Sequence, residues 1–152
     1  MAHIEAIQAA QYSEPYHRQA LPWSEIQARY RTSHAFLKPQ GKNILDFGGG
    51  DGAFATQLAD RGARVCLYDL DENATRFAMV DPRILILDGL YQLKNQFNII
   101  VALEVLEHIP DDTSVIETLV SMLKTGGQLL FSVPSVNVRV PQKHCEHYSW
   151  DY

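Results

Sequence analysis

The stretch Asn43-Ile-Leu-Asp-Phe-Gly-Gly-Gly-Asp-Gly-Ala53 decides how the chain around it folds. Ile44, Leu45 and Phe47 form a short run of strand-forming residues, and the glycines that follow end this run abruptly. The residues after Ala53 are typical of a helix. The stretch therefore predicts a strand, a tight glycine turn and a helix, in which backbone N–H groups and the positive end of the helix face a ligand.

Two kinds of cofactor fit this glycine turn. Gly48, Gly50 and Ala53 match G-x-G-x-x-G/A, the fingerprint of dinucleotide-binding (NAD-type) domains. Asp69 then follows at the distance expected of a ribose-binding acid. However, Asp46 precedes Gly48 by two residues, and its carboxylate would repel a pyrophosphate but attract a cationic amine. A tight turn without a ligand is the third alternative, but packing alone gives little reason for an acid and four glycines.

Three segments together resemble one family. Asp46-x-Gly48-x-Gly50-x-Gly52 resembles motif I of the class I S-adenosylmethionine-dependent methyltransferases. Residues 97–110, Phe-Asn-Ile-Ile-Val-Ala-Leu-Glu-Val-Leu-Glu-His-Ile-Pro, are similar to the family's segment after its fourth strand, with Asn98 in place of the usual Asp. Residues 123–134, which begin Leu-Lys-Thr-Gly-Gly and end in Pro, resemble the family's Leu-Lys-Pro-Gly-Gly…Pro. The resemblance covers about residues 43–134.

The pattern of strands and helices predicts an α/β fold. Strands are expected at 44–47, 64–68, 84–87, 97–103 and 128–133, and helices from Ser24 to about Leu37 and at 52–60, 72–80 and 111–123. Alternating strands and helices favour parallel pairing with right-handed crossovers, and continuous apolar strands favour a sheet that is covered on both faces. We therefore expect a doubly wound, mainly parallel, Rossmann-like sheet in a three-layer α/β/α arrangement.

The resemblance also predicts how the chain is divided. It implies an N-terminal helical cover segment (1–42), a cofactor-binding core (43–136) and a tail (137–152) that leads toward a helix and strands of the family that this sequence lacks. The aromatic stretch from Tyr12 to Trp23 is expected to close over the cofactor. Strand 128–133 would then form an edge of the sheet with apolar residues, so we expect a fragment of a longer natural chain that associates through this edge. A tail that folds back over the edge, or pairing with a second copy of a chain that is not a fragment, are the alternatives.

Four acids lie at the carboxyl ends of the first four expected strands: Asp46, Asp69, Asp88 and Glu104. Ligands of open α/β sheets bind beyond the carboxyl ends of the strands, so these acids predict a site independently of any family. The resemblance implies that Asp46 and the glycine turn bind the methionine end, Asp69 the ribose, and Asp88 the adenine. The whole expected set is Asp46, Gly48, Gly49, Gly50, Gly52, Asp69, Leu70, Asp88, Gly89, Leu90, Leu103 and Glu104. An ordinary turn acid remains the alternative for Asp69 and for Asp88.

The implied reaction transfers a methyl group from S-adenosylmethionine to a small-molecule acceptor and leaves S-adenosylhomocysteine. In-line displacement needs mainly alignment, and a base only where the acceptor loses a proton. His108, His144 and His147 are the candidate bases. His144-Cys145-Glu146-His147 has no accompanying C-x-x-C pair, so no metal is expected. A fragment that binds the cofactor without transferring the methyl group is a further alternative.

Composition excludes several other classes of function. The 152-residue chain has a net charge of −5, which gives no indication of a nucleic-acid partner. It contains no apolar run of about 18 residues that would span a membrane. Its start lacks the basic and apolar regions of a secretory signal. Of its two cysteines, Cys66 lies in an expected strand, so we predict a buried thiol and a cytoplasmic location.

Overall fold

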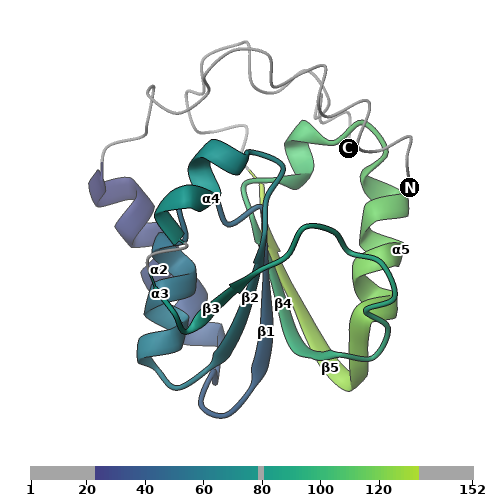
Figure 1. Ribbon diagram of the computed structural model, residues 1–152, viewed down its shortest axis with the longest axis horizontal. Coiled ribbons are helices and arrows are strands. Elements are labelled where there is room, and N and C mark those ends of the chain that lie inside the picture. The colour runs from purple at the N-terminus through teal and green to yellow at the C-terminus, as the bar shows by residue number, and fades with distance from the viewer. Residues whose placement is uncertain (1–22, 79–80, 134–152) are drawn as a thin grey trace.

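The computed structural model describes residues 23–78 and 81–133, which form a parallel sheet with helices on both faces (Figure 1). The five strands are β1 (Asn43–Phe47), β2 (Arg64–Tyr68), β3 (Ile84–Ile86), β4 (Phe97–Leu103) and β5 (Leu123–Ser132). The helices are α2 (Trp23–Phe36), α3 (Ala53–Asp60), α4 (Glu72–Ala78), the 3₁₀-helix η2 (Leu106–His108) and α5 (Asp112–Met122). No helix in this described part is long and apolar enough to cross a bilayer.

The sheet has the order β3-β2-β1-β4-β5, and every pair in it is parallel. The chain first builds outward from β1 to β2 and β3, and then crosses to the opposite side of β1 to add β4 and β5. Asp46 consequently has Leu67 of β2 on one side and Val101 of β4 on the other. The order in which strands are added to the sheet therefore reverses at β1, and ligands of open α/β sheets bind at such a point, here between β1 and β4. The predicted doubly wound sheet is confirmed.

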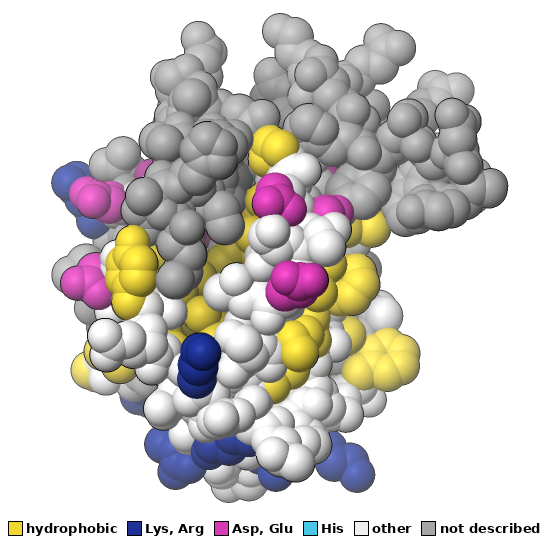
Figure 2. All heavy atoms as spheres, turned by 90° about the vertical axis from the view of Figure 1, so that its right-hand side faces the viewer, with side chains coloured by type: hydrophobic (Ala, Val, Ile, Leu, Met, Phe, Trp, Pro, Cys, Tyr) yellow, Lys and Arg dark blue, Asp and Glu magenta, His cyan; other side chains and the backbone are white. Residues whose placement is uncertain are grey.

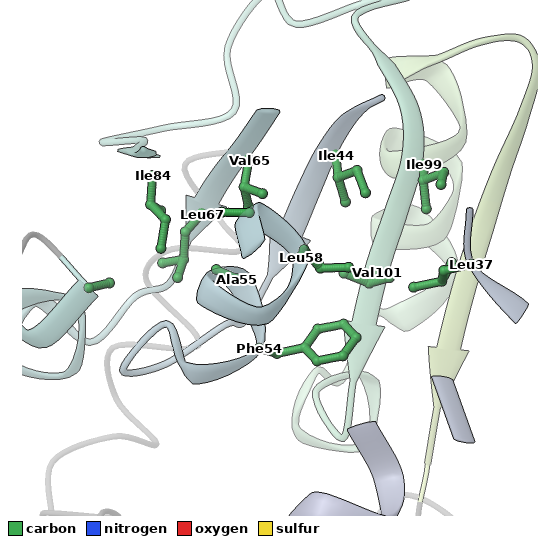
Figure 3. Packing of buried hydrophobic residues seen from close by; sticks show 12 residues of the cluster. Leu37, Ile44, Phe54, Ala55, Leu58, Val65, Leu67, Ile84, Ile99 and Val101 are labelled. Atoms are coloured by element: carbon green, nitrogen blue, oxygen red, sulfur yellow. The ribbon is translucent and has the colours of Figure 1, made fainter. Parts of the chain in front are cut away.

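Two hydrophobic clusters hold the helices to the sheet, because successive strand residues face opposite sides. On one face, Phe54 and Leu58 of α3 pack against Ile44 and Val101 (Figure 3). On the other face, Leu45 lies in a cluster with residues of η2 and α5, which are Leu106, Val115, Leu119 and Met122. Ile44 and Leu45 are both fully buried, so β1 lies in the interior as its apolar sequence predicts.

The helix α2 lies beside α3, on the face that this helix covers (Figure 1). The rings of Tyr30 and Phe54 are 4.8 Å apart between centroids, and His34 lies 5.0 Å from the same Phe54 ring. His34 Nε2 is 3.0 Å from Gln57 Oε1, and its other ring nitrogen contacts the Arg61 guanidinium. The predicted helical cover therefore packs onto the sheet through α3. The stretch before Trp23 lies outside the described residues.

The predicted boundary between the last helix and the last strand was wrong. The sequence placed the end of the helix at Leu123 and the start of the strand at Gln128, whereas α5 ends at Met122 and β5 begins at once. Leu123 already pairs with Phe97, and Gln128 pairs with Ile99, so the register shifts between them. The flexible Gly126, at φ +74°, lies in this irregular part of the strand instead of ending the helix.

The remaining boundaries differ by small amounts. β3 ends at Ile86 rather than Leu87, although the Leu87 N–H still donates to the Leu67 carbonyl at 2.8 Å. α4 reaches Ala78, and the last two residues of the predicted helix, 79 and 80, are not described. α5 begins as predicted after an acid, since the Asp111 side chain accepts a hydrogen bond from the Ser114 N–H.

Candidate functional site

The glycine turn between β1 and α3 is packed against the end of β4. Gly48 has φ +73°, and a Cβ there would collide with the side chain of Val105. Gly50 also has a positive φ, +54°, but a Cβ on it would meet no atom of residues 23–78 or 81–133 within 4 Å. The turn therefore needs glycine for two reasons: contact with the segment after β4 at Gly48, and backbone conformation beside open space at Gly50. This open space is where a ligand can approach the backbone.

Asp46 is the most perturbed group of the site. Asp46 is only 3% exposed, and its Oδ2 atom is buried without a hydrogen-bond partner among the described residues. Burial, followed by the charge of Asp69, raises the pKa of Asp46 to about 7, while the backbone N–H of Ala55 opposes the change. Acids with a pKa perturbed in this way gather at functional sites, so Asp46 is a candidate ligand-binding residue.

Gly49 lies directly against this carboxyl group. A Cβ on Gly49 would be 2.7 Å from Asp46 Oδ2 and 2.9 Å from the Leu67 side chain. Any other residue at this position would displace the acid or the turn. The two neighbouring features of the motif, the acid and the second glycine, are therefore coupled by direct contact.

Asp69 connects the end of β2 to the glycine turn. The Gly50 N–H donates to its Oδ2 at 2.8 Å, and the Asp71 N–H donates to its Oδ1 at 2.8 Å. A carboxylate oxygen has two lone pairs and can accept more than one hydrogen bond, so a group of this kind is able to bind a hydroxyl while it holds a turn. The sequence placed Asp69 at the site but did not reveal that it also holds the turn.

Glu104 ends β4 in a left-handed conformation, with φ +58°, which is unusual for a residue other than glycine. Its Oε1 accepts a hydrogen bond from the Ser132 hydroxyl at 2.8 Å, and its N–H donates to the Ser132 carbonyl at 2.9 Å. Leu103, which precedes it, is half-buried and packs against the cluster on the α3 face. The carboxyl ends of β4 and β5 are thus joined beside the glycine turn.

The expected adenine-binding residues lie at the ends of β2 and β3. Leu70 and Leu90 are half-buried and pack against the same hydrophobic cluster, the one on the α5 face. Asp88 is exposed, and Gly89 lies so close to the Tyr91 ring that a Cβ would be 2.9 Å from it. The structure therefore brings the two leucines to one face of the sheet and leaves Asp88 in contact with solvent.

Among the candidate bases, His108 is the one that the structure describes. It ends η2, its side chain is 20% exposed, and its Nε2 lies 3.8 Å from Oε1 of the buried Glu107. His144 and His147 lie outside the described residues. Within the described part of the chain, no three His, Cys, Asp or Glu side chains are grouped so as to hold a metal ion.

The described charges are separated along the strand direction. The acids named above follow the strands, whereas most of the described basic residues precede the strands or stand at their starts. These basic residues are Lys38, Lys42, Arg61, Arg64, Arg83, Lys94 and Lys124. Figure 2 shows Lys and Arg side chains gathered at the lower end of the visible face and acidic side chains toward its upper end. The field of the molecule therefore attracts a cation toward the candidate site.

Sequence reasoning missed two residues of this site, Ser132 and Val105. Ser132 was predicted only as part of an apolar strand, and its bond to Glu104 joins residues 28 positions apart. A polar residue within the run Leu129-Leu130-Phe131-Ser132-Val133 was the available signal. Val105 was read as part of a motif, and nothing in the sequence indicated that it limits the space at Gly48.

Comparison with known proteins agrees with this geometry. Residues 22–151 match a protein-family model that is described as a methyltransferase domain. A ubiquinone biosynthesis O-methyltransferase of Pseudomonas fluorescens is 28% identical over 158 residues, which cover 90% of this chain and 66% of the relative. A second, of Idiomarina loihiensis, is 32% identical over 109 residues, covering 65% of this chain and 45% of the relative. The chain thus spans between about half and two thirds of the length of these relatives.

Solved structures show the same fold. A S-adenosylmethionine-dependent methyltransferase from Mesorhizobium loti is 26% identical, with a TM-score of 0.63 over 70% of this chain and 53% of that one. A phosphoethanolamine N-methyltransferase of Haemonchus contortus, in complex with S-adenosylmethionine, is 25% identical with a TM-score of 0.62 over 70% of this chain and 27% of that one. Because the family model matches well over half of its length, this chain belongs to the methyltransferase-domain family, whose cofactor is S-adenosylmethionine.

Proposed function

We propose that this chain carries the cofactor site and the transfer centre of an O-methyltransferase, which moves a methyl group from S-adenosylmethionine to a hydroxyl group of a small molecule. The names of the relatives support a hydroxylated precursor of a quinone as this acceptor. A small-molecule acceptor, rather than a nucleic acid, suits the net charge of −5. The free thiol of Cys66 supports a reducing compartment such as the cytoplasm.

The single observation that carries the choice of ligand is the buried carboxyl group of Asp46. Its Oδ2 has no hydrogen-bond partner in the described part of the chain, and its pKa is raised to about 7. A ligand ammonium group near it would supply a donor and a positive charge, and both would favour the ionised form. A dinucleotide pyrophosphate would add negative charge to an acid that burial already disfavours in its ionised form. The methionine end of S-adenosylmethionine therefore fits this position, and NAD does not.

The other residues of the site are assigned by the same reasoning. Gly48, Gly49, Gly50 and Gly52 would form the floor beneath the methionine end, where no side chain obstructs the backbone at Gly50. Asp69 would accept hydrogen bonds from the ribose hydroxyls while it holds the turn. Leu70 and Leu90 would pack against the adenine, with Asp88 and Gly89 at its edge. Leu103 and Glu104 would border the reacting end.

Chemistry at this site depends mainly on alignment. The cofactor supplies an activated methyl group on a sulfonium, which becomes a neutral thioether after in-line transfer, so the residues need to align the reactants and exclude water. A hydroxyl acceptor must also lose its proton. His108 is the described candidate for this base, since it lies 3.8 Å from the buried carboxylate of Glu107, which would stabilise the protonated imidazole. His144 and His147 remain candidates on sequence grounds.

Two measurements test this proposal. Calorimetric titration of the chain with S-adenosylmethionine, S-adenosylhomocysteine and NAD is expected to give binding of the first two and no heat with NAD. Incubation with labelled cofactor and a series of hydroxylated aromatic acceptors is then expected to give an O-methylated product. Binding of NAD alone would overturn the choice of cofactor. Binding of S-adenosylmethionine without transfer to any acceptor would favour a cofactor-binding fragment.

A further inference from the structure

Ser132, at the end of β5, has no role in the function proposed above. We propose that it is a positioning residue, which holds the carboxylate of Glu104 in the orientation that S-adenosylmethionine binding requires. This inference rests on the proposed function, because Glu104 borders the proposed cofactor site. It concerns a residue on a different strand from the glycine turn and from all four strand-end acids.

The contact between the two residues is reciprocal. The Ser132 hydroxyl donates to Glu104 Oε1 at 2.8 Å, and the Glu104 N–H donates to the Ser132 carbonyl at 2.9 Å. In the sheet, Ser132 is the register partner of Leu103, the residue before Glu104. The backbone bond sets where Glu104 begins its turn, and the hydroxyl sets the rotation of its carboxylate. A hydrogen bond from a hydroxyl to a carboxylate is short and stronger than a bond between neutral groups.

The backbone at Glu104 shows that this position is held under constraint. A residue with a Cβ rarely adopts φ +58°, and such residues persist where the surrounding structure holds them, often at functional sites. The turn places the side chain of the next residue, Val105, so close to Gly48 that Gly48 has no room for a Cβ. The segment 104–105 is therefore held by Ser132 at Glu104 and by the glycine turn at Val105.

The sequence of β5 supports a specific need for this hydroxyl. Ser132 follows Leu129-Leu130-Phe131 and precedes Val133 in an otherwise apolar run, where an apolar residue would pack equally well. The residue is half-buried, and its hydroxyl makes a hydrogen bond with a side chain 28 positions away. Because the Ser132 hydroxyl holds the Oε1 atom of this carboxylate, its loss would loosen the orientation of Glu104 and weaken the ligand contacts proposed for it, without removing any group from the ligand itself.

The test is a double-mutant cycle on S-adenosylmethionine affinity, measured by calorimetry for the wild-type chain, Ser132→Ala, Glu104→Ala and the double variant. We expect Ser132→Ala to raise the dissociation constant roughly tenfold, the scale of one lost hydrogen bond to a charged group. Ser132→Thr, which keeps the hydroxyl, is expected to restore the wild-type affinity. In the Glu104→Ala background, Ser132→Ala is expected to cause no further loss.

Ser121→Ala is the matched control, because the Ser121 hydroxyl makes a comparable bond, 2.7 Å to the Thr118 carbonyl, on the exposed side of α5. Its affinity should equal that of the wild-type chain. An unchanged affinity for Ser132→Ala, or an equal loss with and without Glu104, would overturn the inference while leaving the proposed function intact. A wild-type chain that binds no S-adenosylmethionine would instead overturn the proposed function and this inference together.

Discussion

Replacing Asp46 with asparagine is expected to make the free chain more stable at alkaline pH and to leave its stability in acid comparatively unaffected. The pKa of Asp46 is raised from 3.8 to about 7, mainly by burial. The native state therefore holds the proton more tightly than the unfolded chain does. Well below pH 3.8 both states are protonated, and the acid costs no stability. As the pH rises toward 7, the unfolded chain loses its proton first, and the native state is progressively destabilised.

The size of this effect follows from the two pKa values. The difference between 3.8 and about 7 is about three pKa units, and each unit corresponds to about 1.36 kcal/mol, so ionised Asp46 costs about 4 kcal/mol above pH 7. The asparagine side chain is similar in shape to that of aspartate but does not titrate. The free energy of unfolding of Asp46→Asn, minus that of the wild-type chain, should therefore rise by about 4 kcal/mol between pH 4 and pH 8. A fixed cost for burying the amide would change the free energy of unfolding equally at pH 4 and at pH 8, so it would not alter this rise.

Urea unfolding at a series of pH values from 4 to 8 measures this difference, with equal slopes showing that the same surface is exposed. Asp88→Asn is the matched control, because Asp88 follows β3 in the same sheet but is exposed. The burial on which the prediction for Asp46 depends is therefore absent from this control. If the difference for Asp46→Asn were constant from pH 4 to pH 8, the acid would not be protonated preferentially in the native state, and the reasoning from its burial would be refuted.

Four further predictions concern ligands and association. Asp69→Ala should weaken S-adenosylmethionine binding by roughly 1.5–3 kcal/mol, because Gly50 also loses its acceptor; equal affinity in calorimetry would remove Asp69 from the site. His108→Gln should lower the transfer rate about 10²-fold or more and leave cofactor affinity unchanged, as single-turnover and binding measurements would show. Added salt should weaken the binding of cationic S-adenosylmethionine more than that of neutral S-adenosylhomocysteine, and equal salt slopes would count against the attraction of cations to the acidic end. The chain should self-associate through the edge of β5, and light scattering should show that Phe131→Lys reduces this association. Phe131 is suitable because it is 49% exposed, whereas Leu130 packs against the core. A monomeric wild-type chain would refute the prediction.

The positions of most elements could be predicted because their signals are local. β2 and β4 have the bounds that their apolar runs indicated, since each run is continuous and is bounded by breakers or polar residues. The glycine turn and the acid before it also identified the ligand-binding end of β1. The family resemblance was recognisable for the same reason, because its motifs lie within short segments that follow one another in order.

The start of β5 directly after α5 could not be predicted from local signals. Gly126 and Gly127 follow a helix and have the usual composition of its C-terminus. The helix nevertheless ends at Met122, because Leu123 pairs with Phe97 and the Gln96 N–H donates to the Met122 carbonyl at 2.8 Å. Which residue leaves the helix was decided by a neighbouring strand more than 20 positions earlier in the chain. The composition of the residues around Leu123 does not indicate that they pair with Phe97.

The sequence by itself determined the order of strands and helices, the glycine turn and the four acids at the strand ends. These depend on residue spacing and on backbone preferences, which act between near neighbours. Only the tertiary structure decided the state of these groups: the raised pKa of Asp46, the bond from Gly50 to Asp69 across 19 positions, and the bond from Ser132 to Glu104 across 28. Burial and hydrogen bonding depend on which segments the crossovers of the sheet bring together, and no local sequence pattern encodes which distant segments meet.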